Sequence, residues 1–157
     1  MKSIDDALGD IPGLRRAVEE SPFDAVVACS PENVRYAADA MISTQRSIRD
    51  RLALIVWAKG HEPVFVLCQV EEGYIRRESW ITDIRSYKEF VTAPTELAAS
   101  VLTELGLARA HIGCELDYLP IRYASQLATA LPNMRLSPPR EHYRRILGQG
   151  GATRAIR

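Results

Sequence analysis

The chain of 157 residues has the length of one ordinary domain, and its 20 basic and 20 acidic residues give a formal net charge of zero. This balance, with a pI near 6.8, predicts no nucleic acid and no membrane surface as a partner. No apolar run approaches the roughly 20 residues that span a bilayer, and the N-terminus lacks the apolar region of a signal peptide. The three cysteines stand in apolar runs, which favours reduced thiols in a cytoplasmic protein over a disulfide framework.

The apolar residues predict alternating helices and strands along the chain. A leading helix is expected over residues 4–20, and the Val-rich run 24–29 predicts a strand buried on both faces. Ser30, Pro31 and Glu32 then suit a helix start, because they supply an N-cap, a preset φ angle and a negative charge near the positive end of the helix dipole. The apolar face of this helix would hold Val34, Ala37, Ala38, Met41 and Ile42.

A polar loop follows at 43–51, with the sequence STQRSIRDR, and then a strand at 52–58. A turn at 59–62 and an apolar run at 63–70 predict a hairpin. Further on, the patterns indicate a short helix at 71–79 with Tyr74 and Ile75 inward, an edge strand at 81–87 and a helix at 94–105. A strand at 111–116, a turn with a helix at 117–130 and a last strand at 134–136 follow. This alternation predicts an α/β fold with a mixed, mostly parallel sheet, helices on both faces and one antiparallel hairpin.

The loop over residues 43–51 is the polar cluster that chemistry could use. Two interpretations have equal weight. In one, Asp50 forms an ion pair with an arginine of the same loop; in the other, the arginines contact a carboxylate or another anion, since a guanidinium offers a bidentate fork. The candidate binding residues are Gln45, Arg46, Arg49 and Arg51.

No motif for catalysis or phosphate binding stands in the sequence: there is no glycine-rich phosphate loop, no H-E-x-x-H and no G-x-S-x-G. The histidines at 61, 111 and 142 share no metal-ligand spacing and are interpreted as surface or core residues. The pair Glu71-Glu72 is interpreted as acidic charge at a helix start. No catalytic residue, metal site or cofactor is therefore predicted for this chain.

Several motifs stand in an order that resembles a known family. They are DAVVACSPENVRY at 24–36, SWITDIRSY at 79–87, LGL at 105–107 and IGCELDYLP at 112–120. Their order and spacing, from about residue 13 to residue 136, resemble the N-terminal domain of the creatinase, prolidase and aminopeptidase P family. The resemblance implies a three-layer domain with the creatinase N-terminal fold.

The resemblance also implies that a second domain carries out catalysis. In this family a C-terminal pita-bread domain is the catalyst, and it binds two divalent metals (Mn, Co or Zn) through two Asp, one His and two Glu; in creatinases a metal-free version acts on creatine. None of these ligands maps onto this chain. The N-terminal domain helps to form a homodimer and shapes access for a peptide or small guanidino-acid substrate. The resemblance makes Arg46 and Arg49 the best candidates for substrate contact.

The expected organisation is a domain over residues 1–139, the start of a linker helix over 140–147 and a disordered tail over 148–157, where GQGGATRAIR loses all patterning. That loss indicates a truncated chain without its catalytic domain, which we expect to be inactive alone. An alternative is a free-standing small-molecule-binding or dimerisation module without enzyme activity. A flavodoxin-like binder ranks last, because an acid and a proline follow the first strand in place of a phosphate-binding turn.

Overall fold

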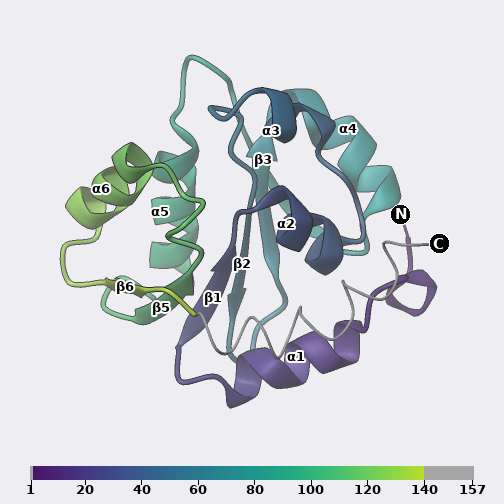
Figure 1. Cartoon of the computed structure of the whole chain (residues 1–157), viewed down its shortest axis with the longest axis horizontal. Coiled ribbons are helices and arrows are strands. Elements are labelled where there is room, and N and C mark those ends of the chain that lie inside the picture. The colour runs from purple at the N-terminus through teal and green to yellow at the C-terminus, as the bar shows by residue number, and fades with distance from the viewer. Residues whose placement is uncertain (1, 140–157) are drawn as a thin grey trace.

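The computed structural model describes residues 2–139, which fold into one sheet and its surrounding helices (Figure 1). The sheet has six strands in the order β4-β3-β2-β1-β5-β6. The strands are β1 (Ala25–Ala28), β2 (Leu54–Ala58), β3 (Val64–Cys68), β4 (Asp83–Tyr87), β5 (His111–Cys114) and β6 (Arg135–Ser137). The helices are η1 (Ile4–Asp6), α1 (Ile11–Glu20), α2 (Pro31–Ala38), α3 (Ser43–Ser47), α4 (Gln69–Glu78), α5 (Pro94–Glu104) and α6 (Ile121–Ala130).

The sheet is mixed and mostly parallel, as the sequence predicts. Strand β2 runs antiparallel to both of its neighbours, β1 and β3, and the other three strand pairings are parallel. Five strands therefore point the same way, and their carboxyl ends share one edge of the sheet with the start of β2. This edge is named the carboxyl edge, and the opposite one the amino edge. The predicted hairpin is confirmed as β2–β3.

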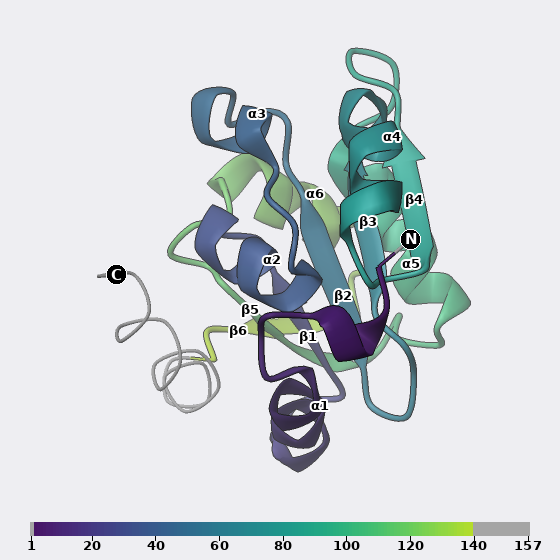
Figure 2. The same ribbon diagram turned by 90° about the vertical axis from the view of Figure 1, so that its right-hand side faces the viewer.

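Helices cover both faces of the sheet and bury an apolar cluster on each (Figure 2). Helices α5 and α6 pack on one face, through side chains such as Leu102 and Leu127. Helices α1, α2 and α4 pack on the other, through Ile11, Val34 and Ile75. Every residue of β1, β2 and β3 is buried, which explains why these strands are continuous apolar runs in the sequence.

The leading helix differs from its prediction. Residues 4–20 contain two helical elements, η1 and α1, because Gly9 and Asp10 interrupt them. A Cβ atom on Gly9 would lie 3.2 Å from the carbonyl oxygen of Tyr36, so this position accepts little more than a glycine. Asp10 begins a new helix by accepting a hydrogen bond from the Gly13 amide at 2.8 Å.

Two expected apolar faces are also smaller than predicted. Helix α2 ends at Ala38, because Asp39 adopts a left-handed φ of 53°. Met41 lies beyond this end and is 40% exposed, whereas Ile42 is buried in the loop that follows. In α4 Ile75 is the only buried apolar residue, and Tyr74 is 41% exposed.

The strand expected over 63–70 ends at Cys68, and α4 begins at Gln69, so Val70 lies on a helix and is 56% exposed. Other local predictions agree with the structure. Strand β4 is an outermost strand of the sheet, as the predicted edge strand should be, and α5 is followed by Gly106 with a φ of 75°. The three cysteines are free and buried. No helix within residues 2–139 is long and apolar enough to cross a membrane. The expected linker helix and tail, at 140–147 and 148–157, lie outside the described residues.

Candidate functional site at the carboxyl edge

A single carboxylate joins β1 to β5 at the carboxyl edge. Glu115, directly after β5, accepts hydrogen bonds from the amides of Cys29 and Ser30, at 2.6 and 2.8 Å. The Ser30 hydroxyl donates to it at 2.8 Å, and the side-chain amide of Asn33 donates as well. The carboxylate also lies at the positive end of the α2 dipole. Four donors on one acidic group therefore fix the turn between β1 and α2.

Ser30 begins α2 as predicted, since its hydroxyl oxygen accepts a hydrogen bond from the Asn33 amide at 3.3 Å. Sequence reasoning did not assign a role to Glu115, although this residue stands within one of the motifs that carry the family resemblance. The donors lie more than 80 residues earlier in the chain, and no local signal links them to Glu115.

The polar segment 43–51 lies between α2 and β2 at the same edge. It is not wholly a loop, because Ser43–Ser47 form the short helix α3. Gln45 is only 1% exposed, and its amide nitrogen donates to the carbonyl of Cys29 at 2.6 Å and to that of Ala53 at 3.5 Å. The structure therefore places Gln45 inside the protein, where it anchors the segment to β1 and to the start of β2.

Arg51 is already engaged. Its Nε and Nη2 atoms donate to the two carboxylate oxygens of Glu89, at 2.8 and 2.9 Å, and the two side chains are 21% and 18% exposed. The hydrogen bond from Arg51 lowers the pKa of the Glu89 carboxyl. Asp50 pairs with Arg122 of α6, so the ion pair expected within the loop itself does not form. The sequence could not predict Glu89 or Arg122 as partners, because each is distant in the chain from the residue that it contacts.

The acidic pair of α4 is engaged in a similar way. Glu71 accepts a hydrogen bond from the Thr44 hydroxyl at 2.5 Å, which ties α3 to α4. Glu72 accepts from the Ser86 hydroxyl and from Arg76, and these two hydrogen bonds lower its pKa. The structural interpretation of this pair therefore agrees with the contacts that it makes.

Arg46 and Arg49 are the two predicted residues that remain available. Arg46 approaches Glu32 only loosely, at 3.6 Å, with side chains 61% and 69% exposed. Arg49 is exposed and forms no ion pair with any residue from 2 to 139. Burial raises the pKa of Tyr118 on the turn after β5, and the nearby charge of Arg49 opposes that rise. The carboxyl edge thus presents two exposed cations, and one of them, Arg49, lies near the phenol of Tyr118.

Large apolar side chains are exposed at the same edge. Phe90 and Val91, in the loop after β4, are 96% and 70% exposed, and Ile121 at the start of α6 is 83% exposed. In Figure 2 the loop after β4 projects beyond the end of that strand. Phe90 has a φ of 64°, which an aromatic residue rarely adopts. The carboxyl rim is defined here as Arg46, Ile48, Arg49, Phe90, Val91 and Ile121. All six side chains are exposed, two of them cationic and four apolar.

No group of three or more His, Cys, Asp or Glu side chains within residues 2–139 is placed to hold a metal ion. His111 instead contacts the Ser137 hydroxyl through Nε2 at 2.8 Å, and His61 is exposed.

Comparison with known proteins identifies the class of this domain. The sequence profile of the creatinase/prolidase N-terminal domain family matches residues 11–146, so the chain belongs to this family. A comparison with curated proteins found no match.

Solved structures share the fold at low sequence identity. The N-terminal domain of an X-Pro dipeptidase from Streptococcus pyogenes is 15% identical with a TM-score of 0.68, and the match covers 85% of this chain and 95% of that one. Aminopeptidase P from Streptococcus thermophilus is 16% identical with a TM-score of 0.63, covering 83% and 93%. A dipeptidase from Pyrococcus horikoshii is 14% identical with a TM-score of 0.70, and 85% of this chain covers 35% of it. The chain thus spans about a third of that dipeptidase.

Proposed function

We propose that this chain is the non-catalytic N-terminal domain of an Xaa-Pro peptidase-like or creatinase-like hydrolase, and that it takes part in dimerisation and shapes substrate access. The observation that carries the proposal is the family match over residues 11–146, joined to the span of the alignment. The chain corresponds to nearly all of the S. pyogenes N-terminal domain but to only 35% of the P. horikoshii dipeptidase. The remaining length of such relatives supplies the partner in this proposal, a C-terminal catalytic domain.

In this proposal the carboxyl rim faces the catalytic partner. Gln45 and Arg51 hold the segment 43–51 in place, since one is buried and the other has both ends of its fork on Glu89. Arg46 and Arg49 are then free to meet the carboxylate of a peptide or a small guanidino acid. The two divalent metals belong to the partner domain, and no step of the chemistry is assigned to this chain.

The first test is an assay of the purified chain with an Xaa-Pro dipeptide and added Mn²⁺ or Co²⁺. We expect no hydrolysis, and metal-dependent turnover by pure protein would contradict the proposal. Size-exclusion chromatography with light scattering of the same sample would separate a monomer of 17.5 kDa from a dimer. A stable dimer without activity would also fit the alternative, a free-standing dimerisation module.

The second test is a chimera in which residues 1–139 replace the matching third of the P. horikoshii dipeptidase. We expect the R46A/R49A pair of substitutions to raise KM with little change in kcat, because these side chains would bind the substrate without touching the reacting atoms. The matched control is R16A, which removes an exposed arginine from α1, on a different element. An equal effect of R16A would assign the change to overall charge rather than to the rim.

A further inference from the structure

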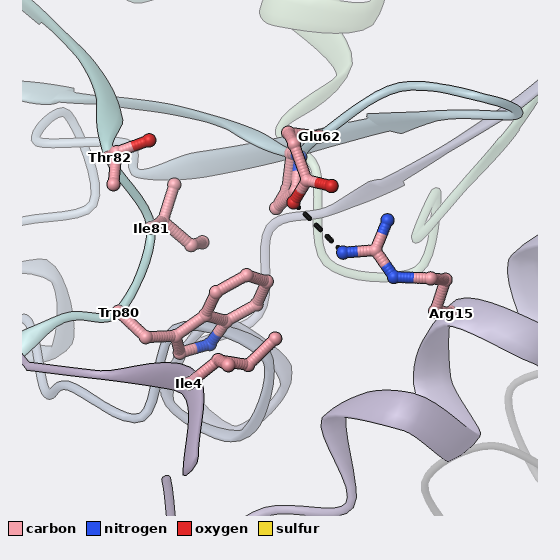
Figure 3. Close-up of a pocket in the computed structure, with 7 residues that line it drawn as sticks. Ile4, Arg15, Glu62, Trp80, Ile81 and Thr82 are labelled. Atoms are coloured by element: carbon pink, nitrogen blue, oxygen red, sulfur yellow. Dashed lines mark hydrogen bonds and ion pairs between the residues drawn. The ribbon is translucent and has the colours of Figure 1, made fainter. Parts of the chain in front are cut away.

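A pocket opens at the amino edge of the sheet, at the opposite end from the carboxyl rim (Figure 3). Its volume is about 250 Å³, and its walls come from η1, α1, the turn before β3 and the segment before β4. Ile4, Pro63, Trp80 and Ile81 provide an apolar lining, and Arg15 and Glu62 provide the charges. Nothing in the proposed function uses this site.

Arg15 is fixed in position but only partly engaged. Its guanidinium carbon lies 5.5 Å from the ring centre of Trp57, a cation–π contact. Only its Nη2 atom is hydrogen-bonded to Glu62, at 2.9 Å, and the Glu62 side chain is 66% exposed. Figure 3 shows this ion pair across the pocket from Trp80 and Ile81. Arg51, in contrast, has both ends of its fork on one half-enclosed carboxylate. An exposed carboxylate with one contact is easily displaced.

The tryptophans behind the pocket show a second unused donor. Trp57 and Trp80 pack with ring centres 5.9 Å apart, and the indole N–H of Trp80 donates to the carbonyl of Ala37 at 2.8 Å. Trp57 is only 4% exposed, yet its indole N–H has no acceptor among the described residues.

We propose that this pocket binds a small carboxylic acid with a branched aliphatic or aromatic body. The carboxylate would replace Glu62 on Arg15 and use both ends of the guanidinium fork, which a single carboxylate matches well. The body would pack against Trp80 and Ile81, in a volume that suits a fragment-sized ligand. Either a free acid or the C-terminal carboxylate of a peptide has this chemistry.

The test uses 4-methylpentanoate as the probe and tryptophan fluorescence as the readout, since Trp57 and Trp80 are the chain's two tryptophans. We expect a saturable change with the acid and none with 4-methylpentanamide, which has the same shape without the charge. R15Q should weaken binding by about tenfold or more, because a charge-assisted contact is lost. E62Q should strengthen binding, since it removes the competing carboxylate from Arg15. R16Q, next to the site on α1, should leave binding unchanged.

If the pocket is a binding site, R15Q and E62Q change the affinity for the acid in opposite directions. If the ion pair is only structural, its loss changes the affinity in the same direction in both variants. Equal binding of acid and amide, no saturable change, or weaker binding by E62Q would overturn the proposal. Circular dichroism confirms that each variant is folded. Binding of Gly-Gly-Leu as tight as that of the free acid would identify a peptide C-terminus as the source, and binding of the free acid alone would identify a small metabolite-like acid.

Discussion

The two edges of the sheet are held by different kinds of contact. At the carboxyl edge, side-chain hydrogen bonds dominate: Glu115 gathers four donors, Gln45 bridges two carbonyls, and Arg51 engages Glu89 with two bonds. At the amino edge, aromatic contacts stand beside such hydrogen bonds: the ring centres of Phe23 and His111 lie 4.9 Å apart, and Arg15 stacks on Trp57. The edges also differ in their connections, since residues 43–53 lie at the carboxyl edge before β2 begins, whereas a short turn at 59–63 joins β2 to β3 at the amino edge.

This difference teaches where polar side chains are needed. The short turn needs few partners, since the His61 amide donates to the carbonyl of Ala58 and the Gly60 amide donates to the Glu19 carboxylate. The long segment has no partner strand for most of its length, so side chains must meet its carbonyl groups. The Tyr87 hydroxyl donates to the carbonyl of Leu52, and Gln45 donates to that of Ala53. The segment therefore holds its shape while Arg46 and Arg49 stay free.

The largest effect on stability is expected from Glu115→Ala, which removes the hydrogen bonds that Glu115 accepts at the carboxyl edge. Loss of the carboxylate leaves the amides of Cys29 and Ser30 without an acceptor, and we expect a loss of about 3 kcal/mol in the free energy of unfolding. Urea denaturation measures it. Glu78→Ala, on the exposed side of α4, is the matched control and should change stability by less than about 0.5 kcal/mol. A similar small change for Glu115→Ala would show that the network is not stabilising.

Gly113→Ala tests the aromatic packing at the amino edge, because it disturbs Phe23. A Cβ atom at Gly113 would lie 2.7 Å from the ring of Phe23, which is itself buried, so the ring must move. We expect a loss of about 2 kcal/mol in unfolding free energy. Gly73→Ala in α4 is the control: its Cβ meets nothing within 4 Å, and we expect a gain of about 0.5 kcal/mol. A neutral Gly113→Ala would contradict the close packing described here.

A smaller, pH-dependent effect is expected from Glu89→Gln. Because Arg51 lowers the pKa of Glu89 in the folded state, the ionised carboxylate stabilises the fold above its ordinary pKa of 4.5. This stabilisation is lost as the pH falls through the lowered pKa. The urea midpoint of the variant should thus be below that of the wild type at neutral pH, and the two should converge in acid. Glu62→Gln, whose partner contact is exposed, should show no difference at either pH. A pH-independent difference for Glu89→Gln would rule out this linkage.

The smallest effect on stability is expected from the R46A/R49A pair of substitutions. Both side chains are exposed, and Arg46 touches Glu32 at only 3.6 Å, so the unfolding free energy should change by less than about 0.5 kcal/mol. Thermal unfolding of this variant, beside the wild type, checks the result. A large destabilisation would show that these arginines hold the segment, and would remove them as free contacts for a substrate.

Much of the fold could be predicted from the sequence, because it follows from local periodicity. Continuous apolar runs indicated β1, β2 and β3, and the apolar spacing from Pro94 with Gly106 at its end indicated α5. The alternation of these elements predicted the fold class, and the family resemblance agreed with it, as does the match to the creatinase/prolidase N-terminal domain.

The features that escaped prediction depend on contacts between distant residues. Helix α3 forms in STQRS, which has no strong helical pattern, because Gln45 is fixed by carbonyls of β1 and of the segment before β2. Glu115 and the Arg51–Glu89 pair likewise join elements far apart in the chain. The amino-edge pocket combines residues from η1 to Thr82, so no single stretch of sequence signals it.

The position of β1 has a consequence for synthesis of the chain. Strands β1 to β4 lie side by side in the sheet and are complete once residue 87 has been made, but the second neighbour of β1 is β5, at 111–114. During translation the nascent chain can therefore form four of the six strands while one side of β1 is still unpaired. Such an edge is open to pairing with other chains until β5 emerges from the ribosome. We expect nascent chains stalled between these points to depend on chaperones more than the finished domain does.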